Sequence, residues 1–160
     1  MIIVNYNRFD AKNYALKWAL TRNPKYYSFD NLGGDCTNFV SQCIYAGSNV
    51  MNYTPLHGWY YKSLNDRTPS WTGVNYLFNF LVNNKDVGPF AKLSNLEDID
   101  IGDVIQLGDK KQNYYHTLIV TNISNNQIYT SSHSQDSMNR PLYSYGYYNV
   151  RCIHILGIRK

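Results

Sequence analysis

Apolar residues recur with helical spacing in three segments of the first half of the chain. Between Asn7 and Thr21 they form a stripe at i, i+3, i+4, i+7 and i+8, made of Ala11, Tyr14, Ala15, Trp18 and Ala19. Asn7 is expected to cap this first helix, since its side chain can bond a free amide of the first turn. A second helix is expected from Asp35 or Cys36 to Gly47. A third is expected around residues 74–83, with Val74, Leu77, Phe78 and Leu81 on its apolar face.

The hydrophobic period changes from about 3.6 to 2 after residue 100, which is typical of strands. Four strands are expected, at residues 103–107, 115–123, 127–133 and 150–159. Asn125-Asn126 favours a tight turn between the second and third of them. Helices followed by antiparallel strands predict an α+β fold. Residues 48–70 are expected to form a long functional loop, and without repeats or linkers residues 1–160 are expected to be one domain.

The segment GGDCTNFVSQC, residues 33–43, places a cysteine where a loop becomes a helix. Unpaired N–H groups and the helix dipole favour negative charge there, so the Cys36 thiol is expected to have a lowered pKa and to be nucleophilic. The same N–H groups can stabilise an oxyanion. Asp35 is the expected cap, and Gly33-Gly34 leave room for a substrate backbone. A small buried residue at a helix start is the alternative interpretation.

A nucleophilic cysteine requires a base, and His116 is the best candidate among the four histidines because it opens an apolar strand. An even-numbered turn at Asn125 would pair position 116 with 133 or 135, on one face of adjacent strands. His133 is therefore the expected orienting residue for His116, and Asp136 is the alternative. An odd-length turn would instead place the two histidines on opposite faces. His154 is expected to be a packed strand residue.

Composition narrows the possible functions. Hydrophobic residues make up 44% of the 160 positions and charged residues 16%, which is typical of a globular chain. The net charge of +4 comes from scattered residues, so nucleic-acid binding is not expected. No apolar run is long enough to span a membrane, and the first ten residues do not form an intact signal peptide. Three cysteines without paired spacing favour neither disulfides nor a CxxC metal site.

Five segments of the chain, taken together, resemble the putative amidase domain family of papain-like cysteine hydrolases, which is related to NlpC-type and CHAP domains. They are YNRFDAKNYALKWAL, NPKYYSFDNLGGDCTNFVSQC, GDVIQL, HTLIV and SSHSQD before RPL. The resemblance implies a helical N-terminal half that carries the nucleophile, packed on a C-terminal antiparallel sheet that carries the histidine. It maps Cys36 to the nucleophile, His116 to the base and His133 to the third member. Oxyanion or substrate contacts are assigned to Asp35, Asn31 and Trp59.

The resemblance also implies a function and a setting. Related hydrolases cleave peptidoglycan peptides or the amide that joins peptide to sugar, so a peptidoglycan peptidase or amidase is expected. No cofactor or metal is expected, and the chain is expected to be a monomer. It is expected to be secreted, cell-wall associated or a phage-encoded lysin.

Three alternatives remain open at the level of sequence. Cys36, His116 and His133 could supply three zinc ligands, although no two of them are close in sequence. The sixteen tyrosines, with the tryptophans, could line the groove of a non-catalytic cell-wall or ligand-binding module. The same thiol chemistry could also serve acyl transfer or deamidation of a protein target.

Overall fold

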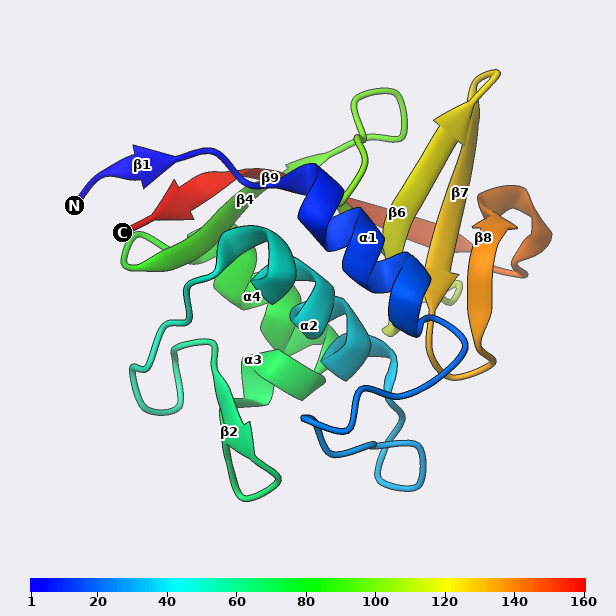
Figure 1. Cartoon of the computed structure of the whole chain (residues 1–160). Coiled ribbons are helices and arrows are strands. Elements are labelled where there is room, and N and C mark those ends of the chain that lie inside the picture. The colour runs from blue at the N-terminus through cyan, green and yellow to red at the C-terminus, as the bar shows by residue number, and fades with distance from the viewer.

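The computed structural model describes all residues, 1–160, and has an α+β architecture, as predicted (Figure 1). The helices are α1 (Arg8–Trp18), α2 (Cys36–Ser48), α3 (Pro69–Thr72) and α4 (Val74–Asn83), with a short 3-10 helix at Leu142–Ser144. The strands are β1 (Ile3–Val4), β2 (Tyr61–Ser63), β3 (Asp66–Arg67), β4 (Gly88–Ser94), β5 (Val104–Gly108), β6 (Tyr114–Ser124), β7 (Gln127–Ser132), β8 (Ser137–Pro141) and β9 (Asn149–Arg159).

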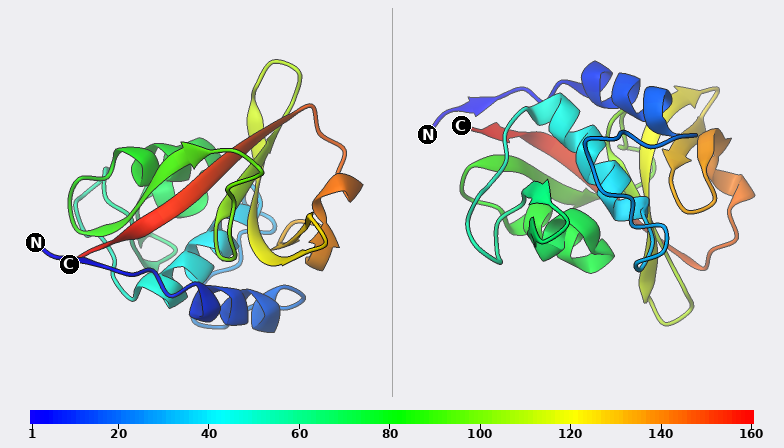
Figure 2. Two further views of the ribbon diagram at one scale, coloured as in Figure 1. Left: turned by 90° about the horizontal axis from the view of Figure 1, so that it is seen from above. Right: turned by 60° about the horizontal axis from the view of Figure 1, so that its bottom comes forward.

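Seven strands form one antiparallel sheet in the order β1-β9-β5-β6-β7-β8, and β4 also pairs with β9. Because β1 pairs with the end of β9, the two termini lie close together, as both views of Figure 2 show. Strands β2 and β3 form a separate hairpin within the segment that the sequence predicted to be a long loop. None of the helices combines the length and apolar character that crossing a bilayer requires.

The two faces of the sheet pack against different parts of the chain. Residues of α1, α2 and α4 form the larger apolar cluster, together with Val104, Ile119 and Ile153 of the strands. Figure 2 shows α1 and α2 together on one side of β9. The smaller cluster contains Leu118 and Val120 of β6. Alternate residues of β6 therefore face the two clusters, as the period of 2 predicts.

The first helix is shorter than predicted. Asn7 caps it as expected, because its side-chain oxygen accepts a hydrogen bond from the Asp10 amide at 3.0 Å. The helix ends at Trp18, three residues before the predicted end at Thr21. The segment that follows leads without regular structure to α2.

Candidate active site

The loop before α2 makes a left-handed turn at its two glycines. Gly33 and Gly34 have φ angles of 88° and 99°, which other residues adopt only with strain. A Cβ atom on Gly34 would also lie 3.3 Å from the Ser134 hydroxyl. The glycines thus let the loop approach the β7–β8 turn closely. Helix α2 then begins at Cys36, one of the two starting positions that the sequence predicted.

Asp35 occupies the N-cap position, but its side chain does not cap the helix, contrary to the prediction. The carboxylate is fully buried and is turned back toward the loop. One oxygen accepts hydrogen bonds from the Phe29 amide at 2.7 Å and from the Asn38 side chain at 2.9 Å. The other oxygen bonds Nδ1 of His133. Asp35 therefore fixes the loop in front of Cys36, and its burial leaves no surface for the predicted substrate contact.

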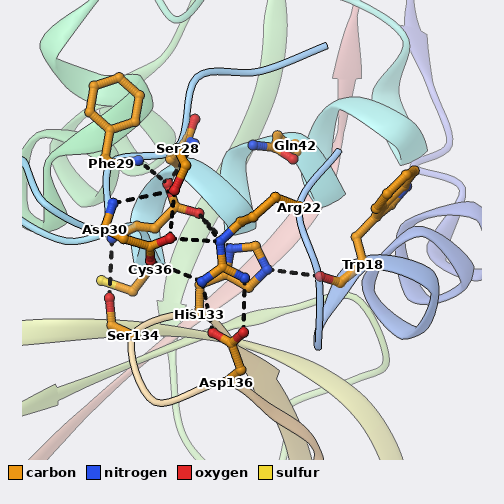
Figure 3. A network of polar contacts seen from close by, with 12 residues as sticks. Trp18, Arg22, Ser28, Phe29, Asp30, Cys36, Gln42, His133, Ser134 and Asp136 are labelled. Atoms are coloured by element: carbon orange, nitrogen blue, oxygen red, sulfur yellow. Dashed lines mark hydrogen bonds and ion pairs between the residues drawn. The ribbon is translucent and has the colours of Figure 1, made fainter. Parts of the chain in front are cut away.

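His133 is buried, and both of its ring nitrogens have partners (Figure 3). Nδ1 bonds Asp35, and Nε2 lies 2.8 Å from the backbone carbonyl of Trp18. A carbonyl only accepts hydrogen bonds, so Nε2 must carry a proton and donate it. The ring also stacks on Phe39, with 4.1 Å between the ring centroids. The predicted hydrogen bond between His116 and His133 is therefore absent.

An irregularity in the β6–β7 hairpin explains this failure. The tight turn predicted at Asn125 and Asn126 is present: both residues have positive φ, and Ser124 pairs with Gln127. The register then shifts by one residue between Val120 and Asn122. A one-residue shift moves every later side chain to the other face. His133 consequently faces the helices, and His116 faces the opposite side of the sheet.

Asp136, the alternative orienting residue, is held by Arg22. The guanidinium of Arg22 donates two hydrogen bonds of 2.9 Å to Asp136 and two more, of 2.9 and 3.0 Å, to Asp30 (Figure 3). These contacts join the loop before α2 to the β7–β8 turn. They occupy both carboxylate oxygens of Asp136, so the structure does not support the predicted contact with His116.

The Cys36 thiol lies against the first residues of β6. Its sulfur is 3.8 Å from the Thr37 hydroxyl, and Thr37 bonds the Thr117 hydroxyl at 2.8 Å. Burial raises the pKa of the Cys36 thiol, and hydrogen bonds from the Thr117 backbone and from Thr37 offset this only in part. The predicted lowering of this pKa is therefore wrong, because desolvation outweighs the favourable groups at the helix start.

His116 opens into a cleft of about 640 Å³, which Ser134 also lines. Burial, and secondarily the charge of Arg140, lowers the pKa of His116 to about 4. The imidazole is therefore neutral at pH 7. Its ring makes no hydrogen bond within the chain, and its centroid lies 6.2 Å from that of Tyr145. A neutral imidazole with a free nitrogen can accept a proton.

The remaining predicted site residues have different surroundings. Trp59 is fully buried and donates a hydrogen bond to Ser41, so it cannot contact a substrate as predicted. Asn31 is exposed in the loop before α2. His154 bonds Asp103 at 2.6 Å and is a structural strand residue, as expected.

The zinc alternative fails on geometry. It required Cys36, His116 and His133 to converge on one ion, and both nitrogens of His133 are engaged elsewhere. Moreover, no three His, Cys, Asp or Glu side chains are grouped as metal binding requires.

Comparison with known families places the chain in an amidase class. The family model described as "Putative amidase domain" matches residues 5–156, so the chain belongs to this family. Among curated proteins, it is 32% identical over 140 residues to "Uncharacterized protein YhbB" of Bacillus subtilis, covering 84% of this chain and 43% of that protein. It is 26% identical over 147 residues to "Uncharacterized protein YjcM" of the same organism, covering 87% and 33%.

The chain thus spans less than half the length of each of these two relatives. No solved structure matches it. Family membership supports an activity on amide bonds.

Proposed function

We propose that this chain is a cysteine-dependent amide hydrolase in which Cys36 is the nucleophile and His116 is the base. The observation that carries the proposal is the 2.8 Å hydrogen bond between Thr37, the residue that follows Cys36, and Thr117, the residue that follows His116. This hydrogen bond holds the start of α2 against the part of β6 that contains His116. The proposed nucleophile, Cys36, and the proposed base, His116, are thereby brought to the same end of β6.

The open edge of β6 supports the approach of the two side chains. Pairing between β6 and β7 begins only at Ile119, so Thr117 and His116 have no partner in β7. The start of α2 is bonded to β6 at Thr117 in this unpaired part. From the edge of a strand, a thiol can reach a side chain on the far face of the sheet. We infer that Cys36 meets His116 around this edge, from the side of the cleft.

The chemistry starts from a neutral thiol and a neutral imidazole. As the Cys36 sulfur bonds the carbonyl carbon of the substrate, His116 takes the thiol proton. The resulting imidazolium then protonates the leaving amine, and a thioester remains on Cys36. Water hydrolyses the thioester with His116 again as the base. Free N–H groups at the start of α2 stabilise the oxyanion in both steps.

No third member is needed to hold His116 in this proposal. Packing fixes its ring, since it is more than half buried beside Tyr145 and in the strand pair with Leu107. The pair of Asp35 and His133 acts one step further away, by holding the loop that positions Cys36. The proposed machinery is therefore a dyad supported by a buried structural pair.

We propose the peptide of bacterial peptidoglycan as the substrate and a papain-like arrangement of the site. A helix that starts at the cysteine and packs on an antiparallel sheet that carries the histidine supports the second statement. Membership in the amidase family supports an amide bond as the target in the first statement. Such a substrate lies outside the cytoplasm or is reached by a lysin, and we expect the chain to act there as a monomer.

Digestion of purified peptidoglycan tests this function. The protein and its Cys36→Ala variant are incubated with the polymer, and the soluble fragments are analysed by mass. The proposal expects new amine and carboxylate ends from the unchanged protein only. Equal fragment release by both proteins, or none by either, would contradict it.

The low pKa of His116 predicts the pH dependence of this activity. The base must be neutral, and an imidazole is neutral above its pKa, which burial lowers to about 4. The acidic limb of kcat/KM should therefore lie near pH 4 rather than near the ordinary histidine value of about 6.5. A kcat/KM profile between pH 3.5 and 8 on a soluble peptide fragment measures it. A limb near 6.5 would show that the acting base is not buried His116.

A further inference from the structure

The cleft beside His116 contains one arginine that no carboxylate neutralises. Its charged lining residues other than the histidine are Asp30 and Arg140. Asp30 is already bonded twice by Arg22, which is the main cause of its lowered pKa. Arg140 forms no ion pair, whereas Arg8 pairs with Asp103 and Arg22 with three aspartates. The cleft therefore presents a guanidinium that has no carboxylate partner.

The guanidinium of Arg140 is held in place before any ligand arrives. Its Nε donates to the Ser144 hydroxyl at 2.9 Å, and one terminal nitrogen donates to the Ser144 carbonyl at 3.0 Å. Its flat face lies on the Tyr145 ring, 3.9 Å from the centroid. The other terminal nitrogen has no partner within the chain. An oriented guanidinium with free donors suits a planar anion, since less side-chain freedom is lost on binding.

The position of Arg140 also couples it to the base. Tyr145 lies between the two groups, in contact with Arg140 and near the His116 ring. The charge of Arg140 opposes protonation of His116, although the proposed reaction requires His116 to become an imidazolium. An anion bound to Arg140 would offset this charge. Binding of an anionic substrate would thus favour the protonated base that delivers the proton to the leaving amine.

We propose that Arg140 binds a carboxylate of the peptide substrate and so selects acidic peptides for cleavage by Cys36 and His116. This inference rests on the proposed function, because it places the substrate in the cleft of His116. The carboxylate could be the terminal group of the peptide or that of an acidic residue within it. Both sources present the same planar anion to the guanidinium, and the experiment below separates them.

Binding to the inactive Cys36→Ala protein tests the proposal without turnover. The probes are the peptide L-Ala-γ-D-Glu-L-Lys-D-Ala, its C-terminal amide, and the analogue in which the free carboxylate of the glutamyl residue is an amide. Calorimetry measures the Kd of each probe for the Cys36→Ala protein and for the same protein that also carries Arg140→Gln. We expect one of the two amides to bind roughly tenfold or more weakly than the parent peptide, as for a charge-assisted pair, and this amide identifies the carboxylate. Arg140→Gln should bind the parent peptide and that amide equally.

Two further variants separate recognition from a structural effect. Arg159→Gln removes an arginine that likewise stacks on an aromatic ring, at the far end of β9, and should leave all Kd values unchanged. Arg140→Lys, which keeps the charge but loses the planar fork, should retain part of the preference. The proposal would be overturned if the Cys36→Ala protein with Arg140 unchanged bound all three probes equally or bound none of them. It would also be overturned if Arg140→Gln left the preference among the probes unchanged. None of these binding results changes the digestion experiment with Cys36→Ala, so the proposed function is tested separately from the role of Arg140.

Discussion

The single variants Cys36→Ala and His116→Ala should each have a kcat on a soluble peptidoglycan fragment that is lower by at least about 10³-fold. The nucleophile and the base act on the same proton in the same step, so removing either removes the step. For such a unit, the double variant is expected to be hardly worse than either single variant. Steady-state kinetics of the three variants measure this directly.

The control for this prediction is His57→Ala, which removes an exposed histidine of the segment between α2 and β2. It should retain the full kcat. Thermal unfolding of each variant separates loss of chemistry from loss of fold. Additive losses from Cys36→Ala and His116→Ala would mean that the two residues act independently. Full activity of His116→Ala would exclude it as the base.

His133→Ala should destabilise the fold by about 3–5 kcal/mol in urea unfolding, as for removal of the hydrogen-bonding partner of a buried carboxylate. The substitution leaves the Asp35 carboxylate buried without its histidine and the Trp18 carbonyl without its donor. It also opens a cavity against Phe39. The enzyme that remains folded should keep the pH dependence set by His116, because His133 does not contact that ring.

Two matched variants sharpen this second prediction. Asp35→Asn keeps an acceptor for the Phe29 amide and gains a donor for His133 Nδ1, so it should cost far less than Asp35→Ala. Asp136→Asn removes one end of a partly exposed ion pair with Arg22 and should cost less than about 1 kcal/mol. A loss for His133→Ala as small as that for Asp136→Asn would contradict the buried-pair interpretation.

Local patterns predicted the main elements well. The Gly-Gly-Asp-Cys segment predicted that α2 begins at Asp35 or Cys36, and the period of 2 predicted β5, β6, β7 and β9 nearly to their ends. Strands β4 and β8 were missed because both contain proline, which usually argues against a strand. The turn at Asn125-Asn126 was predicted because it depends only on these two neighbouring residues.

The errors in the site have a different origin, because they depend on tertiary structure. The register shift near Val120 depends on the pairing of two strands, and no pattern in the sequence of either strand predicts it. The raised pKa of Cys36 depends on how deeply α2 packs against β6, whereas the helix dipole is readable from the sequence. Arg140 is the first residue of the RPL segment that the sequence analysis singled out, but its place in the cleft follows from the missed strand β8.

The alkylation rate of Cys36 tests the proposed dyad of Cys36 and His116 without a substrate, because this rate depends on the nucleophile and on its base. Native protein and its His116→Ala variant are treated with one equivalent of iodoacetamide at pH 7, and the adducts are mapped by mass. All three thiols are buried, but Cys36 is the most exposed, at 8%, and the only one proposed to have a base beside it. If the dyad is correct, Cys36 is labelled first and His116→Ala slows its labelling. Faster labelling of Cys43 or Cys152, or an unchanged rate at Cys36 in His116→Ala, would contradict it.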